Sequence, residues 1–206
     1  MPSLTTKTLA QAAQDLAARD EILARILATH GAPPMWRRAT GFATLVHIIL
    51  EQQVSLKSAK SMLRRLQAAI DPFTPERFVE VGEAHFRGLG VTRQKSSYLL
   101  RLSESMLSGE LSLTRLARLS DDEARIQLTR IKGIGSWSAD VYLLMAMRRA
   151  DIWPAGDLAL AVAVKELWGL EFKPTPDELE RIAERWRPYR AVAARMLWQH
   201  YLFGDR

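Results

Sequence analysis

SDDEARIQLTRIKGIGSWSADVYLLMAMRRADIWPAGDLAL, residues 120–160, is the most informative stretch of this 206-residue chain. Ser120 and Glu123 have the spacing of a capping box, which predicts the start of a helix. Gly133 and Gly135 follow that helix. Because glycine has no Cβ, this turn can adopt left-handed conformations and approach another molecule closely. The pattern predicts a helix that ends in a glycine hairpin.

A second helix is predicted directly after the hairpin, over residues 136–149. The backbone N–H groups of Gly135, Ser136 and Trp137 are the unpaired donors at its start, and such donors bind anions. The alternative interpretation is an ordinary turn between two helices. Lys132, beside the turn, favours the anion site.

Composition limits the class of protein. The chain is 48% hydrophobic, so it can bury a substantial core. No apolar run approaches the ~20 residues that span a bilayer, and the start lacks the apolar core of a signal peptide. We therefore expect an intracellular protein without a membrane partner, located in the cytoplasm or with the nucleoid. Without cysteine, the chain offers no ligands for an iron–sulfur cluster or a zinc–thiolate site.

The charge is basic, with 29 Lys and Arg against 23 Asp and Glu, or a formal net charge of +6. A basic surplus favours a polyanionic partner, although charge also serves solubility. No stretch alternates with a period of two, whereas apolar residues recur at helical spacing throughout, which predicts an all-α protein. Among the predicted helix starts are Asp20, Ser55, Thr92 and Thr175, and Pro188 is expected to open the last helix.

Two segments of residues 120–160 together resemble the helix-hairpin-helix DNA glycosylase superfamily. These are Ile131-Lys132-Gly133-Ile134-Gly135 and the loop Trp153-Pro154-Ala155-Gly156-Asp157. Within it, the chain is most similar to the alkylated-base branch, 3-methyladenine DNA glycosylase II. The segments Ile48–Ser55 and Arg187–Arg190 also resemble parts of that family, so the similarity extends over about residues 36–202.

The resemblance implies two helical lobes with the active cleft between them. Residues 50–150 would form a helical barrel lobe with the hairpin, and residues 1–49 plus 151–206 a second lobe built from both chain ends. It also implies a monofunctional enzyme that flips alkylated purines out of damaged double-stranded DNA and releases them, which starts base excision repair. A monomer without a cofactor is expected.

By this resemblance Asp157 is the catalytic residue. Breakage of a glycosidic bond passes through a cationic, oxocarbenium-like sugar that a carboxylate stabilises. Asp157 could act on that cation directly or position a water molecule. Its plain alternative role, as the N-cap of the following helix, is compatible with both.

The candidate base pocket contains three aromatic side chains and one amide. An alkylated purine is cationic, so aromatic rings can bind it through cation–π attraction. Trp137 matches a pocket tryptophan of the family, whereas relatives have their pocket tyrosine where this chain has Val141, one residue before Tyr142. Trp153 is the third aromatic candidate. Core packing is the alternative for each ring.

The resemblance places Gln52 toward the pocket and Gln53 at the wedge that fills the gap left by a flipped base. Exposure at a solvated helix end is the alternative for both. Relatives insert an apolar wedge here, so the amide leaves the manner of gap filling open.

The hairpin is expected to bind the DNA backbone through Lys132, Gly133, Ile134, Gly135 and Ser136. The family also suggests a sodium or potassium ion held by the main-chain carbonyls of Ile131 and Ile134, with no metal bound by side chains. Relatives that also cut the strand carry a lysine two residues after the second hairpin glycine. This chain has Trp137 there, which predicts no lyase activity.

Three alternatives remain. A non-catalytic helix-hairpin-helix DNA-binding module would need the hairpin and the charge but leaves the loop before Asp157 unexplained. An unrelated helical acid–base enzyme would ignore the hairpin. A glycosylase for a different damaged base would share every motif, because the sequence does not specify which base is preferred.

Overall fold

The computed structural model describes residues 3–204, and within that range every regular element is a helix. The prediction of an all-α protein is therefore confirmed. Contacts divide the chain into two compact units. The central unit is Arg38–Tyr142, and the terminal unit combines the residues up to Arg37 with those from Leu143 onward. The boundaries lie at residues 37/38 and 142/143, rather than near 50 and 150.

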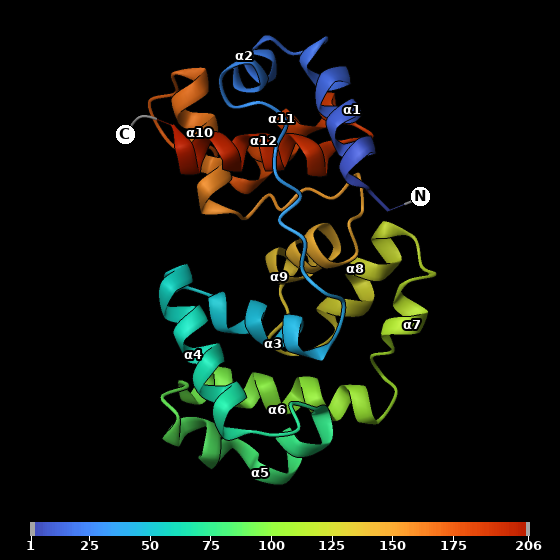
Figure 1. The fold of residues 1–206 in the computed structure, drawn as a ribbon, viewed down its shortest axis with the longest axis vertical. Coiled ribbons are helices and arrows are strands. Elements are labelled where there is room, and N and C mark those ends of the chain that lie inside the picture. Colours follow the sequence, from blue (N-terminus) through green and yellow to red (C-terminus); the bar gives the residue numbers. More distant parts are fainter. Residues whose placement is uncertain (1–2, 205–206) are drawn as a thin grey trace. The chain divides into compact units, whose positions relative to one another are not determined.

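The central unit contains the glycine hairpin (Figure 1). Its helices are α3 (Phe42–Glu51), α4 (Leu56–Ala69), α5 (Pro75–Gly88), α6 (Arg93–Leu107), α7 (Leu113–Leu116), α8 (Asp121–Thr129) and α9 (Ser136–Val141). The helix α3 contacts α4, α6 and α9, which explains why residues 38–49 belong here rather than with the chain ends. Seven of its ten residues are buried.

The terminal unit is assembled around the last helix (Figure 1). Its helices are α1 (Thr6–Ala17), α2 (Glu21–His30), α10 (Leu158–Trp168), α11 (Pro176–Ala183), the 3-10 turn η2 (Glu184–Trp186) and α12 (Arg190–Phe203). The helix α12 contacts α1, α2 and α10, and it is buried on every side from Arg190 to Gln199. An element covered all round has no amphipathic stripe, so α12 is the core of this unit.

Local capping explains most helix starts. The side chains of Asp20, Ser55, Thr92 and Thr175 each accept a hydrogen bond from a backbone N–H in the first turn of their helix, as predicted. Pro188 does not open the last helix, because α12 begins at Arg190 after the N-cap Tyr189.

The second hairpin helix also differs from the prediction. It is α-helical only to Val141, and the π-helical segment η1 (Tyr142–Ala146) follows instead of an α-helix that reaches Arg149. The boundary between the two units lies within η1. The longer hydrogen-bond repeat of a π segment shifts the side-chain register, which a sequence with ordinary helical spacing does not reveal.

Candidate functional site

The hairpin is built by local interactions in the central unit. The side chain of Ser120 accepts from the Glu123 N–H, and a Glu123 carboxylate oxygen accepts from the Ser120 N–H at 2.9 Å, which completes the predicted capping box of α8. The two helices that flank the hairpin are also joined by an ion pair. The guanidinium of Arg125 on α8 donates to the buried carboxylate of Asp140 on α9 at 2.7 Å. This ion pair joins the two helices across the turn.

Gly133 is required at its position for two reasons. Its φ is +99°, which L-residues rarely adopt. In addition, a Cβ at this residue would lie 2.3 Å from Cγ of Tyr98, a tyrosine on α6. The hairpin backbone therefore lies directly on the ring of Tyr98. This contact was not predictable from the sequence, because Tyr98 is distant along the chain.

Gly135 has a different role. Its φ is −82°, an ordinary value, and a Cβ there would meet nothing within 4 Å. It is the N-cap of α9 without a side-chain hydrogen bond, and both Gly135 and Ser136 are exposed. Lys132 is exposed as well, whereas the neighbouring Ile134 is buried and anchors the turn. The hairpin thus presents backbone and one lysine on an accessible surface.

The candidate cation site shares this turn. The carbonyl of Ile131 accepts a hydrogen bond from the Ile134 N–H at 2.9 Å, which closes the turn. A carbonyl oxygen has two lone pairs, so this bond leaves capacity for a further ligand at Ile131.

Gln52 connects the end of α3 to the hairpin. Its Nε2 donates to the carbonyl oxygen of Gly133 at 2.8 Å and to Oγ of Ser138 at 2.9 Å. Both N–H donors of the amide are therefore used within the protein, and only its oxygen remains to contact a ligand. Gln53, the next residue, is exposed and has a φ of +57°. The Gln52 side chain thus links the end of α3 to the hairpin, and the next residue, Gln53, is exposed.

Two charged contacts fix the end of α3 just before these glutamines. The ammonium of Lys95, a buried residue of α6, donates to the Leu50 carbonyl at 2.7 Å, and burial lowers the pKa of Lys95. A cation at the C-terminus of a helix complements the helix dipole. The guanidinium of Arg38 binds both carboxylate oxygens of Glu51 at 2.8 Å. These contacts fix the end of α3 and therefore the position of the exposed Gln53.

Asp157 begins α10 in the terminal unit and is 9% exposed. Its Oδ1 accepts two hydrogen bonds of 3.0 Å, one from the Leu160 N–H and one from Nε1 of Trp198 on α12. Hydrogen bonds to an ionised group are stronger than neutral ones, and a helix N-terminus stabilises negative charge. The carboxylate is therefore held in a fixed orientation by two different elements.

A network of charged residues, in which Asp151 and Arg190 are buried and Arg187 is exposed, connects the loop before Asp157 to the start of α12. Arg190 donates to the Asp151 carboxylate through Nε at 3.0 Å and Nη2 at 3.1 Å. Arg187 adds a third bond at 2.7 Å to the same carboxylate. These arginines are the ones that resembled the family at the sequence level, and the structure gives them a structural role in this loop.

The aromatic candidates differ in accessibility. Trp137 is half-buried. Tyr142 is 1% exposed, and its hydroxyl accepts from the Gly41 N–H at 3.2 Å; burial raises its pKa, although the Gly41 bond partly offsets this. Trp153 is also 1% exposed and packs on Trp186 with ring centroids 5.3 Å apart. Tyr142 and Trp153 are therefore packed in the interior, the alternative considered for each.

The structure divides the predicted site residues into two groups. It brings Gln52 against the hairpin in the central unit, and it places Asp157 and Trp153 in the terminal unit. Three residues of these contacts were not predicted from the sequence, namely Tyr98, Ser138 and Trp198. The residues next to Trp198 in the sequence give no indication of its hydrogen bond to Asp157.

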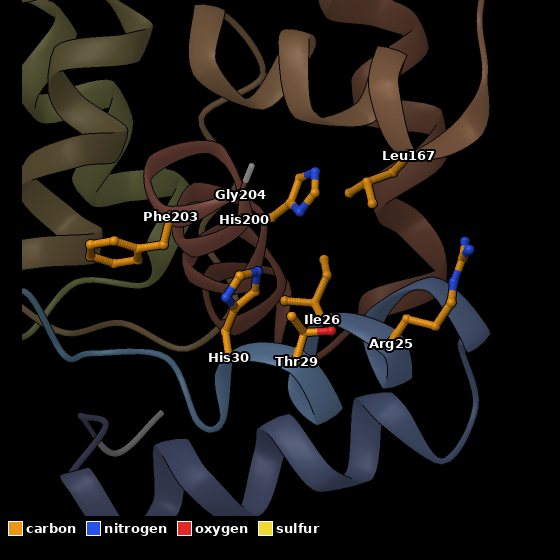
Figure 2. A pocket seen from close by; sticks show the side chains of 8 residues that line it. All are labelled: Arg25, Ile26, Thr29, His30, Leu167, His200, Phe203 and Gly204. Atoms are coloured by element: carbon orange, nitrogen blue, oxygen red, sulfur yellow. The ribbon is translucent and has the colours of Figure 1, made fainter. Parts of the chain in front are cut away.

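A hollow of about 400 Å³ lies elsewhere in the terminal unit (Figure 2). Figure 2 shows His30 and His200 facing each other there, with Leu167 and Ile26 also lining it. None of the predicted site residues lines it. Within residues 3–204, no group of three or more His, Cys, Asp or Glu side chains could hold a metal ion, and no helix is long and apolar enough to cross a membrane.

Residues 46–188 match the HhH-GPD superfamily of base excision DNA repair proteins. The chain belongs to this superfamily. The matched range contains the hairpin, both glutamines and Asp157, whereas Trp198 lies beyond it.

Individual HhH-GPD relatives support the same placement. The chain is 26% identical to a putative DNA-3-methyladenine glycosylase, YfjP, of Bacillus subtilis over 86% of its own length, and it spans 64% of that relative. It is 29% identical to the alkylbase DNA glycosidase-like protein mag2 of Schizosaccharomyces pombe, with 75% of each chain covered. The structure of S. pombe 3-methyladenine DNA glycosylase Mag1 in complex with abasic DNA is similar with a TM-score of 0.86 at 26% identity, covering 95% of this chain and 98% of that one.

Proposed function

We propose that this protein is a DNA glycosylase that flips alkylated purines of the 3-methyladenine type out of duplex DNA and releases them, as the first step of base excision repair. The observation that carries the proposal is the Asp157 carboxylate, fixed at a helix start by Leu160 and Trp198. The HhH-GPD membership and the similarity to a putative DNA-3-methyladenine glycosylase and an alkylbase DNA glycosidase-like protein support the substrate class.

In the proposed reaction, Asp157 stabilises the positive charge that develops on the sugar as the glycosidic bond breaks. An alkylated purine is already a cation, so it leaves without strong acid assistance. Water completes the hydrolysis, either after direct stabilisation of the sugar cation or through positioning by the same carboxylate. Both routes require the negative charge of Asp157.

DNA is held, in this proposal, by the exposed backbone of the hairpin. Amide contacts to phosphate are independent of sequence and weaken as salt rises. The main-chain carbonyls of Ile131 and Ile134 would hold a sodium or potassium ion, whose positive charge would attract a phosphate. Gln53, which is exposed after the end of α3, fills the gap left by the flipped base. Trp137 contacts the flipped base. The protein acts as a monomer, inside the cell, and needs no further cofactor.

The test is release of free base from methylated duplex DNA, identified by mass. The Asp157→Asn variant should bind the DNA as the wild type does and release almost nothing, because Asn also caps helices well but lacks the charge. DNA binding by the wild type without any released base would instead identify a non-catalytic DNA-binding module. Release of a different damaged base would reassign the substrate.

We also propose that the enzyme leaves the abasic strand intact. Strand cleavage by relatives requires a lysine amine that forms an imine, and an indole at residue 137 has no basic nitrogen for this. Borohydride should trap no specific protein–DNA adduct, and strand breaks should appear only after alkali. Efficient trapping on damaged duplex would show that another amine acts.

A further inference from the structure

Trp36 has an unusual backbone conformation for a bulky residue. It lies in the segment before α3, within the terminal unit, and its φ is +42°. Large side chains rarely adopt such values, and they persist only where the surrounding structure holds them. Residues of this kind are concentrated at functional sites. Trp36 is half-buried, so part of its indole remains accessible.

A buried arginine on α12 fixes the residue just before Trp36. Arg195 has no exposed surface, and its Nε donates to the Met35 carbonyl at 3.1 Å. It also donates to the carbonyls of Leu144, at 2.9 Å, and Ala191, at 3.3 Å. Burial lowers the pKa of Arg195 to about 10. A charge is costly to bury among carbonyl oxygens alone, and here its contacts determine the path of the chain into Trp36.

The ring of Trp36 lies edge-on against Trp198. Their ring centroids are 6.4 Å apart with an interplanar angle of 71°. Trp198 in turn donates to the Asp157 carboxylate. A line of contacts therefore connects Trp36, Trp198 and Asp157, all within the terminal unit.

We propose that Trp36 is a substrate-contacting residue of the site around Asp157, where its indole stacks on the cationic alkylated purine. This inference rests on the proposed glycosylase function. Tryptophan is the aromatic side chain that binds cations best. Trp153 and Tyr142 cannot take this role because each is 1% exposed.

Three variants separate contact with the base from a purely structural role. Trp36→Leu and Trp36→Gly both remove the ring, but glycine also relieves the positive φ, so the two should differ in thermal stability. If the ring contacts the base, both should slow single-turnover release of 7-methylguanine by about tenfold, the scale of one desolvated cation–π contact. Trp36→Phe should keep most of the rate. The Kd for undamaged duplex should not change.

The control is Trp168→Leu, which removes a ring that packs on Trp186 rather than on Trp198. It should lower thermal stability and leave the single-turnover rate unchanged below its melting temperature. Two results would overturn the role of Trp36. In one, the release rates of the Trp36 variants fall in proportion to their melting temperatures; in the other, these rates equal the wild-type rate. A wild type that releases no base would instead refute the proposed function, and the role of Trp36 with it.

Discussion

Trp198 donates its indole N–H to Oδ1 of Asp157 over 3.0 Å, from a position 41 residues further along the chain. The same oxygen accepts the Leu160 N–H, which belongs to the helix that Asp157 caps. The local bond alone would leave the carboxylate free to rotate about its own helix start. The bond from α12 makes the orientation of the proposed catalytic group depend on the core of the terminal unit.

Trp198→Phe should therefore impair base release more than DNA binding. Phenylalanine keeps an aromatic ring but removes the N–H donor. A hydrogen bond to a charged group contributes about 1.5–3 kcal/mol, so the single-turnover rate should fall by roughly 10- to 100-fold. Trp168→Phe, a matched change in the same unit, should leave the rate intact. An unchanged rate in Trp198→Phe would show that Leu160 is sufficient to orient Asp157.

Gln52→Met should loosen the hairpin. Methionine has a similar length but cannot donate to the Gly133 carbonyl or the buried Ser138 hydroxyl. Each lost hydrogen bond costs about 1 kcal/mol, and amide hydrogen exchange across residues 131–138 should accelerate. Gln53→Met provides the control, because Gln53 is exposed. Equal exchange rates in both variants would mean that Gln52 does not hold the hairpin.

The two hairpin glycines should respond differently to alanine. Gly133→Ala combines a positive φ with a Cβ placed 2.3 Å from the Tyr98 ring, so the free energy of unfolding should fall by about 2–4 kcal/mol. Gly135→Ala meets open space and should cost less than about 1 kcal/mol, the effect of a weaker N-cap. Urea denaturation measures both. Similar losses would contradict the close contact with Tyr98.

Acid should weaken the central unit through His47. Burial lowers the pKa of His47 below its ordinary value of 6.5, although Glu51, 3.5 Å away, partly opposes this. As the pH falls below about 6.5, His47 is therefore protonated more readily in the unfolded chain than in the folded chain. The free energy of unfolding falls as the pH drops through this range. His47→Gln should lose less stability than the wild type between pH 7 and pH 5. Parallel curves would show that His47 does not titrate differently on folding.

Local features of the fold were predictable from the sequence. The capping side chains of Asp20, Ser55, Thr92 and Ser120 act within one turn of their own helix, so neighbouring residues are sufficient to identify them. The N-cap role of Asp157 was predictable for the same reason, because it depends only on the nearby Leu160 N–H. The motif could be located because its parts are close in sequence.

Contacts between distant residues were not predictable. The ring of Tyr98 beneath Gly133 and the indole of Trp198 on Asp157 depend on how helices pack, and the spacing of apolar residues does not encode which side chains meet. The burial of Tyr142 and Trp153 was not predictable for the same reason. Aromatic residues on helices satisfy both a core and a pocket pattern, and only packing separates the two.

The division of the chain has a consequence for synthesis on the ribosome. The central unit is continuous, so all of it has been translated once Tyr142 is added. The terminal unit is not: the Gln199 amide donates to the His30 carbonyl across 169 residues, and α2 has no α12 to pack on until the last helix emerges. Contacts of such long sequence separation form slowly because they must close a long loop. The surfaces of α1 and α2 that pack on α12 therefore stay uncovered while the whole central unit is translated.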